Sequence, residues 1–288
     1  MNDDRYAQDR RRRFRPVPIR MLVPNVITLL ALCAGLTAIR LAVEHRFELA
    51  LGAIVFAAML DGIDGRVARL IKGQSRFGAE LDSLADFVNF GVAPGLILYF
   101  WQLNELNNVG WIASMIFAIS GGLRLARFNA TIDEPGRPAF AASYFTGVPA
   151  PAGAICVLLP IYVAFVGGPV VPAMLSAAYT LLIAFLMVSR LPVFSGKMIG
   201  TRVPPEMVLP VFVLVVLFIA LLIGYPWYVL TSGTLLYLVS LPVGLWAYRR
   251  QEHAAAAQPG AAAPPSGTAD PFHAPGGEVE PERPTRLN

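Results

Sequence analysis

Long apolar segments separated by short polar ones dominate the chain up to about residue 250. Each is about 17 to 25 residues long, the length that a helix needs to cross a bilayer. Only helices and closed barrels satisfy their backbone in lipid, and unbroken apolar runs exclude the alternating pattern of a barrel. The pattern therefore predicts eight transmembrane helices, at residues 22–43, 48–69, 82–101, 109–127, 148–166, 170–189, 207–224 and 227–248.

The composition agrees with this pattern. Of the 288 residues, 56% are hydrophobic and 15% are charged, whereas about 25% of the residues in a soluble domain are charged. The net charge of +4 is too small to argue for nucleic acid as a partner. We predict an all-α integral membrane protein, a bundle of about eight transmembrane helices in a lipid bilayer.

Lysine and arginine residues predict the orientation of these helices, because short cytoplasmic loops carry an excess of them. With the N-terminus inside, the outer loops hold Arg46, with Arg40 at the end of its helix. The inner loops then hold ten such residues: Arg66, Arg69, Lys72, Arg76, Arg124, Arg127, Arg137, Arg190, Lys197 and Arg202. Both termini are therefore expected on the cytoplasmic side.

The two ends of the chain differ from the apolar body. Residues 1–20 carry seven arginines without apolar periodicity, which predicts a basic cytoplasmic arm. Such an arm suits an anionic lipid surface or serves only as a topology signal. Residues 251–288 are rich in Ala, Pro and Gly and have no apolar face, so we expect a disordered tail.

Four aspartates interrupt the second and third apolar segments, where a charged residue costs roughly 2.5 to 3.5 kcal/mol at the helix centre. Asp61 and Asp64 are three residues apart, and Asp82 and Asp86 are four apart, so each pair shares a helical face. The short connection between the two segments makes the helices antiparallel neighbours. The sequence therefore predicts four carboxylates converging near the cytoplasmic surface.

A convergence of four carboxylates points to divalent cations, which remove the repulsion between like charges in a low-dielectric site. Two ions supply four positive charges, and all-oxygen ligation suits Mg²⁺ or Mn²⁺ rather than zinc. Paired ions of this kind serve displacement at phosphorus. A single aspartate also has a plainer explanation: Asp64 as a cap or partner of Arg69, and Asp82 as the acidic first turn of a helix.

Gly65, Gly78 and Arg69 extend the predicted site towards a phosphate-bearing substrate. A residue without a Cβ lets a bulky ligand come close, at a cost in helix stability that needs a reason. Arg69 lies one turn beyond Gly65 and can reach a phosphate with its guanidinium fork.

Two motifs lie eight residues apart: Asp61-x-x-Asp64-Gly65-x-x-Ala68-Arg69 and Gly78-x-x-x-Asp82-x-x-x-Asp86. Together they resemble the complete signature of the CDP-alcohol phosphatidyltransferase family. The resemblance implies a six-helix catalytic core over residues 21–205, with two additional helices over 206–250. It also implies a homodimer, two metal ions held by the four aspartates, and a CDP-linked lipid bound at the cytoplasmic face.

The same resemblance implies roles for individual residues. The lipid substrate, CDP-diacylglycerol, would be bound by Asn25, Thr28, Gly65, Arg69, Ser75 and Gly78. At a helix start, Asn25 and Thr28 are equally explained as caps. Asp86 would act as the catalytic base as well as a metal ligand. Chemistry supports this role separately, because no histidine is near and Glu80 projects from a different helical face.

Segments at 87–94, 120–129 and 187–192 resemble the phosphatidylserine synthase branch of the family, which implies L-serine as the acceptor and CMP as the leaving product. Asn89, Arg124 and Arg127 would then bind serine, the arginines through its carboxylate. Arg127 is equally explained as a positive-inside anchor. Lys197 and Arg202 instead favour a sister enzyme with a phosphorylated acceptor, glycerol 3-phosphate or inositol phosphate.

A divalent-cation transporter is the alternative from a different functional class, because aspartates inside a helical bundle also mark ion pathways. A transporter would need acidic groups across the whole membrane depth. Glu44, Glu48 and Glu105 lie only at the outer ends of their segments. The sequence therefore favours an enzyme over a transporter.

Overall fold

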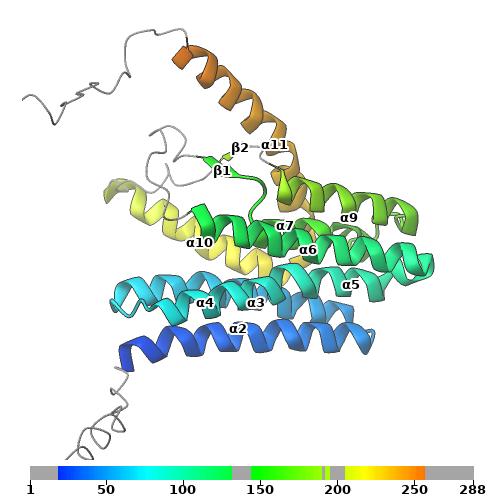
Figure 1. The fold of residues 1–288 in the computed structure, drawn as a ribbon, viewed down its shortest axis with the longest axis horizontal. Helices are drawn as coiled ribbons and strands as arrows, with labels where there is room; N and C mark the ends of the chain where they lie inside the picture. The colour runs from blue at the N-terminus through cyan, green and yellow to red at the C-terminus, as the bar shows by residue number, and fades with distance from the viewer. Residues whose placement is uncertain (1–18, 132–143, 190–191, 195–204, 257–288) are drawn as a thin grey trace, which may run out of the picture. The chain divides into compact units, whose positions relative to one another are not determined.

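The computed structural model describes residues 19–131, 144–189, 192–194 and 205–256 (Figure 1). Ten α-helices, a π-helical segment and a 3-10 turn make up most of this part of the chain. In order, they are α2 (Ile19–Val43), α3 (Phe47–Leu70), α4 (Arg76–Asp86), η1 (Phe87–Val92), α5 (Ala93–Trp101), η2 (Leu103–Leu106), α6 (Asn108–Thr131), α7 (Ala150–Val157), α8 (Leu159–Phe165), α9 (Ala173–Val188), α10 (Pro205–Gly224) and α11 (Pro226–Ala256).

Each of the eight predicted segments corresponds to a helix or to joined helices, so the prediction of an all-α membrane protein is confirmed. Within the described residues, five helical stretches are long and apolar enough to cross a membrane: Leu22–Val43, Arg76–Trp101, Asn108–Ala130, Glu206–Gly224 and Pro226–Trp246. α9 is a shorter apolar helix. Several apolar helices of this kind are typical of a multi-pass membrane protein.

The third predicted segment begins earlier than its hydrophobicity suggests and is not a uniform helix. α4 starts at Arg76 because Ser75 caps it, accepting a hydrogen bond from Gly78 N at 2.9 Å. After Asp86 the chain widens into the π-helical turn η1 before α5 begins. Pro94 contributes to this widening, because it has no N–H to donate to the preceding turn.

The fifth predicted segment is divided at Leu158 into α7 and α8. Pro160 lies in the first turn of α8, a position that proline favours, and it cannot continue the hydrogen bonding of α7. A second departure is a short antiparallel pair of strands, β1 (Tyr144–Thr146) and β2 (Pro192–Phe194). At three residues each, these strands are too short for a hydrophobic pattern to reveal.

α11 continues to Ala256, past the position where we expect the tail to begin. The added residues include three alanines, the strongest helix formers. Residues 1–18 of the predicted basic arm and 257–288 of the predicted tail lie outside the described residues. Four of the basic residues predicted in the inner loops also lie outside the described residues: Arg137, Arg190, Lys197 and Arg202.

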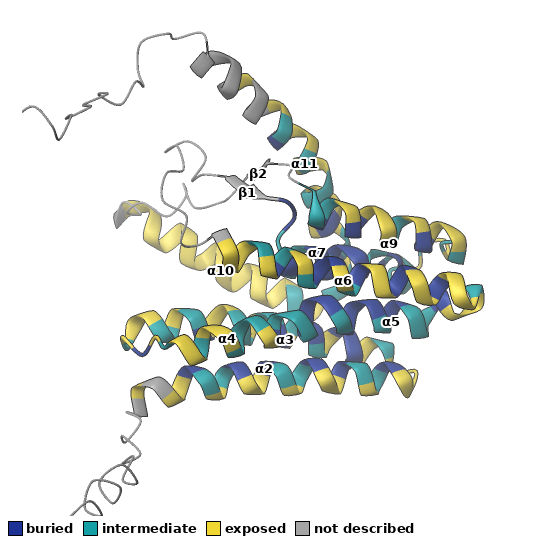
Figure 2. Ribbon diagram, viewed as in Figure 1, coloured by how far each residue is buried: buried dark blue, intermediate teal, exposed yellow. Residues whose placement is uncertain are grey.

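Small side chains let the helices pack closely. Ala38 and Ala42 of α2 and Ala50 and Ala57 of α3 are fully buried, where α2 and α3 form an antiparallel hairpin. Buried residues gather where α5, α6, α7 and α9 meet (Figure 2). Among them are larger side chains such as Phe90.

The outward faces of these helices are apolar and exposed. On α10, every residue from Glu206 to Leu221 is exposed, and most of them are aliphatic. An apolar surface of this extent marks contact with a membrane or a partner.

Candidate metal and phosphate site

The four predicted aspartates converge between the second half of α3 and α4. One carboxylate oxygen from each of Asp61, Asp64 and Asp82 lies within 4.8 Å of the others. Asp86 lies next to this group and interacts electrostatically with all three of its members. The helical spacing and the short α3–α4 connection together bring the four side chains to one place.

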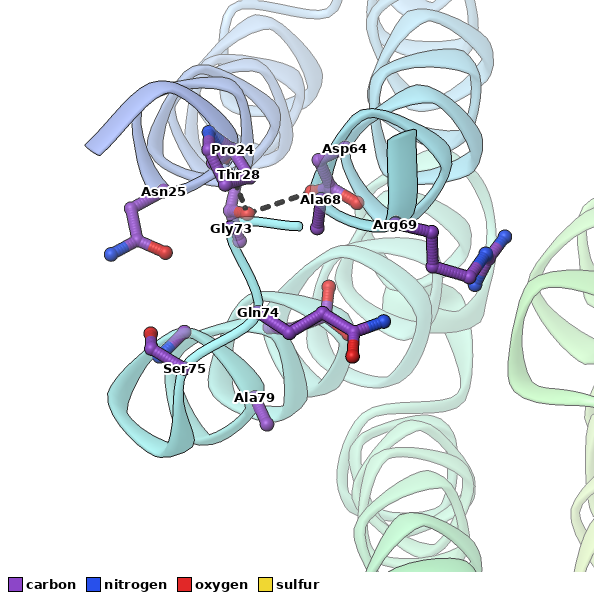
Figure 3. A pocket seen from close by; sticks show the side chains of 13 residues that line it. Pro24, Asn25, Thr28, Asp64, Ala68, Arg69, Gly73, Gln74, Ser75 and Ala79 are labelled. Carbon is purple, nitrogen blue, oxygen red and sulfur yellow. Dashed lines mark hydrogen bonds between the residues drawn. The ribbon is translucent and has the colours of Figure 1, made fainter. Parts of the chain in front are cut away.

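Protein groups do little to neutralise this cluster. Thr28 on α2 donates a hydrogen bond of 2.7 Å to Asp64 Oδ2, and its hydroxyl also lies 3.1 Å from the carbonyl oxygen of Pro24 (Figure 3). Asp64 itself is buried. Asp86 Oδ1 is buried as well and has no hydrogen-bond partner among the described residues.

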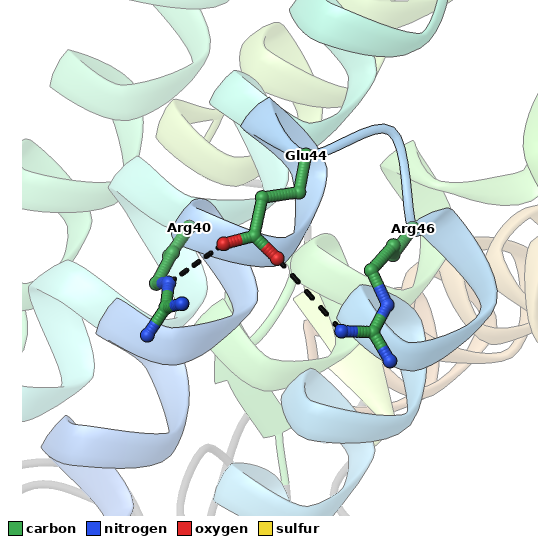
Figure 4. A network of polar contacts seen from close by, with 3 residues as sticks. All are labelled: Arg40, Glu44 and Arg46. Carbon is green, nitrogen blue, oxygen red and sulfur yellow. Dashed lines mark hydrogen bonds and ion pairs between the residues drawn. The ribbon is translucent and has the colours of Figure 1, made fainter.

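Ion pairs are found elsewhere in the described part of the chain. Glu44 pairs with Arg40 at 2.8 Å and with Arg46 at 3.8 Å, at the other end of the α2–α3 hairpin (Figure 4). No described lysine or arginine forms an ion pair with the aspartate cluster. An all-oxygen set with an orphaned buried carboxylate oxygen fits a hard divalent cation.

A pocket of about 640 Å³ lies beside the aspartates, where the first turns of α2, the end of α3 and the start of α4 meet (Figure 3). It brings together all six residues that the sequence assigns to the CDP lipid. Its lining consists of Pro24, Asn25, Thr28, Asp64, Gly65, Ala68, Arg69, Gly73, Gln74, Ser75, Gly78, Ala79 and Asp82.

The two signature glycines serve the pocket in different ways. A Cβ on Gly65 would meet only Arg69 Nη1, at 3.8 Å, so this glycine leaves free space in the pocket. A Cβ on Gly78 would come within 2.7 Å of Asn25 Oδ1 and 3.0 Å of Ser75 Oγ. Gly78 therefore allows α2 and the cap of α4 to close together around the pocket.

The pocket is polar at its rim as well as at its acidic base. Arg69 extends from α3 at one edge, and Asn25 and Ser75 lie on the opposite side (Figure 3). The first turn of α4 also borders the pocket through Gly78 and Ala79, and the positive end of the helix dipole favours an anion there. The arrangement combines groups that suit cations with groups that suit phosphate.

The residues predicted to bind serine lie outside this pocket. Asn89 on η1 is buried, and neither its Nδ2 nor its Oδ1 has a hydrogen-bond partner among the described residues. Arg124 on α6 is half-buried and within electrostatic range of Asp86. Arg127 Nη1 donates a 2.6 Å hydrogen bond to the carbonyl oxygen of Val188, which ties α6 to α9.

Residues 21–189 match the family model described as CDP-alcohol phosphatidyltransferase, which covers more than half of the chain. The chain belongs to the CDP-alcohol phosphatidyltransferase family. Residues 206–242 match a second family model, described as CDP-alcohol phosphatidyltransferase 2. The family that the two motifs indicated is therefore confirmed.

Three relatives of this CDP-alcohol phosphatidyltransferase carry the name CDP-diacylglycerol–serine O-phosphatidyltransferase. The protein of Mycobacterium leprae is 40% identical over 226 residues, which are 78% of this chain and 74% of the relative. That of Mycobacterium tuberculosis is 44% identical over 187 residues, 64% of each chain. That of Helicobacter pylori is 36% identical over 228 residues, 78% of this chain and 91% of the relative. The match thus spans less than two thirds of the Mycobacterium tuberculosis protein.

One polar pocket residue of this CDP-alcohol phosphatidyltransferase was not predicted. Gln74 lies in the connection between α3 and α4, and its side chain lines the pocket (Figure 3). The two motifs specify no residue in that connection. Only the fold shows that it borders the site.

Proposed function

We propose that this protein transfers the phosphatidyl group of CDP-diacylglycerol to the hydroxyl of L-serine and releases CMP. One observation carries the proposal: the aspartate cluster adjoins a pocket lined by all six residues expected to hold the CDP lipid. The names of the relatives supply the acceptor, since three of them are CDP-diacylglycerol–serine O-phosphatidyltransferases.

The diphosphate of the lipid substrate lies in the pocket next to Gly65, where no Cβ obstructs it. Arg69 at the rim supplies positive charge and N–H donors to its oxygens, and the positive end of the α4 dipole adds to the attraction. Asn25 and Thr28 on α2 border the same space from the cytidine side. Such fixed donors orient the β-phosphorus towards the aspartates.

Asp61, Asp64, Asp82 and Asp86 would hold two divalent ions, Mg²⁺ or Mn²⁺. When bound, such ions neutralise the diphosphate charge and polarise the bonds at the reacting phosphorus. Thr28 keeps Asp64 oriented through its 2.7 Å hydrogen bond. A hydrogen-bonded ligand of this kind holds its geometry without reorganisation during the reaction.

Asp86 would act as the base, as the family resemblance implies, and its Oδ1 has no hydrogen-bond partner among the described residues, which leaves it able to accept a proton. It accepts the proton of the serine hydroxyl as the serine oxygen bonds to the β-phosphorus. The bond between that phosphorus and the CMP oxygen breaks, and Arg69 stabilises the charge that develops on CMP. The products are phosphatidylserine and CMP.

The same proposal includes an orientation and an assembly. Both termini and the active site lie on the cytoplasmic side, in keeping with the basic residues near the aspartate cluster, such as Arg66 and Lys72. The protein acts as a homodimer, as the family resemblance implies. Cross-linking in native membranes and reporter fusions at each terminus test these two points.

An acceptor panel tests the proposed reaction. Purified full-length protein is incubated with CDP-diacylglycerol, Mg²⁺ or Mn²⁺, and one labelled acceptor: serine, glycerol 3-phosphate or inositol phosphate. Of the three acceptors, we expect only serine to give CMP release and a labelled lipid. CMP release with a phosphorylated acceptor instead of serine would support phosphatidyl transfer but refute serine as the acceptor. No release with any acceptor would refute the enzyme.

A further inference from the structure

A group of buried polar side chains lies on the side of Asp86 that faces α6 and α11. Arg124 on α6 is within electrostatic range of Asp86 and also of Tyr237 on α11. Asp86 Oδ1, Arg124 Nε and Tyr237 Oη are all buried, and none has a hydrogen-bond partner among the described residues. Arg124 thus interacts electrostatically with two side chains, and each of the three keeps a buried polar atom without a hydrogen-bond partner.

This region is distinct from the pocket assigned to the CDP lipid. Neither Arg124 nor Tyr237 lines that pocket, which α2, α3 and α4 enclose. Asn89, one turn beyond Asp86, also has two unpartnered buried polar atoms, but its side chain lies against Gly35 of α2 and belongs to a different side of the helix. Buried polar groups are normally paired, so several unpaired ones near a reactive carboxylate indicate a missing polar ligand.

Other side chains of the protein show how a purely structural hydroxyl behaves. Tyr179 on α9 donates a 2.8 Å hydrogen bond to the carbonyl oxygen of Cys156. Thr180 donates to the carbonyl oxygen of Ser176 at 2.8 Å, in the usual manner of a helical threonine. On α11, by contrast, Thr234 is buried and its Oγ1 has no hydrogen-bond partner among the described residues. One turn later, the hydroxyl oxygen of Tyr237 also lacks a partner.

We propose that Tyr237 and Arg124 form the binding site for the acceptor amino acid. The acceptor carboxylate lies between the guanidinium group and the tyrosine hydroxyl, and the acceptor hydroxyl points to Asp86. This inference rests on the proposed function and adds a residue from α11, outside the six-helix core. α11 thereby contributes to catalysis by binding the second substrate.

The charges of the site favour a carboxylate over a phosphate monoester. One arginine and one neutral hydroxyl donor match the single negative charge of a carboxylate. A phosphate monoester carries up to two charges and needs further cations. Among the described residues, Arg127 is the next arginine on α6, and it already donates to Val188.

The test measures the KM of each substrate separately, with full-length protein and CMP release as the readout. Tyr237→Phe removes only the hydroxyl group. We expect the KM for serine to rise about tenfold, the effect of one hydrogen bond to a charged group. The KM for CDP-diacylglycerol should stay within about twofold of the wild-type value, because the variant leaves the lipid pocket intact.

Tyr228→Phe is the matched control, since Tyr228 lies on the same helix and is exposed. It should keep both KM values. A second readout compares serine with serinamide, which lacks the carboxylate. The wild-type protein should strongly prefer serine, and Tyr237→Phe and Arg124→Lys should each reduce that preference.

The outcomes separate this inference from the proposed function. If the wild-type protein releases no CMP with serine, the proposed function fails. If it is active but Tyr237→Phe leaves the KM for serine and the serine preference unchanged, the acceptor site is wrong. Equal rises in both KM values would show that Tyr237 only supports packing. If Tyr237→Phe does not fold, the serinamide comparison with Arg124→Lys decides whether a carboxylate is recognised.

Discussion

The substitution Gly65→Ala separates the stability of the α3 helix from the space needed by the substrate. The added Cβ would meet no protein atom closer than Arg69 Nη1 at 3.8 Å. The folded protein therefore tolerates the methyl group. Replacing glycine by alanine inside a helix should even stabilise it by about 0.5 to 1 kcal/mol.

The bound substrate should not tolerate the same methyl group. A phosphate resting against the Gly65 backbone would be displaced by about 1.5 Å, the length of a carbon–carbon bond. A misplacement of about 1 Å can cost about 100-fold in rate. We expect kcat/KM for CDP-diacylglycerol to fall about 10- to 100-fold, equivalent to about 1.4 to 2.7 kcal/mol.

Steady-state kinetics and thermal unfolding in detergent together test this prediction. Gly62→Ala is the matched control, because Gly62 also has free space for a Cβ and lies on α3 but does not line the pocket. It should gain the same helix stability and keep its activity. A stable Gly65→Ala protein with wild-type kcat/KM would show that no substrate approaches this glycine.

Three further predictions concern single side chains. Asp86→Asn should leave the melting temperature near that of the wild type and lower kcat about 10²- to 10⁴-fold, because the proton acceptor is lost; wild-type turnover would remove Asp86 as base. Thr28→Val removes the hydrogen-bond donor to Asp64 Oδ2. The Mg²⁺ or Mn²⁺ concentration for half-maximal activity should therefore rise about 10- to 100-fold. An unchanged metal dependence would show that Thr28 does not orient Asp64 for metal binding. Ser75→Ala removes the cap of α4 and should destabilise the protein by about 1 kcal/mol, whereas Ser75→Asp should retain most of the stability; equal melting of both variants would show that the cap contributes nothing.

Helical periodicity was enough to predict the aspartate cluster. Spacings of three and four residues determine a helical face, and the short loop after α3 forces the next helix to return alongside it. The six residues assigned to the CDP lipid came from the family resemblance instead, three of them from the two motifs, and the fold places all six around one pocket.

Long-range packing decides what the sequence could not show. Arg124 and Arg127 are three residues apart on α6, yet Arg124 approaches Asp86 while Arg127 donates to Val188 on α9. No local pattern distinguishes them. Tyr237 lies about 150 residues from Asp86 in the sequence, within an apolar segment where a tyrosine is unremarkable on composition alone.

The π-helical turn η1 has a consequence for how its span responds to mutation. A π turn holds one residue more than an α turn, and one residue corresponds to about 100° of rotation. The acidic face of α4 and the core-facing side of α5 are therefore rotated relative to each other about the axis of one continuous helix. Deleting a single residue between Val88 and Gly91 would restore a regular helix, and either the carboxyl groups or the packed apolar side chains would then point the wrong way.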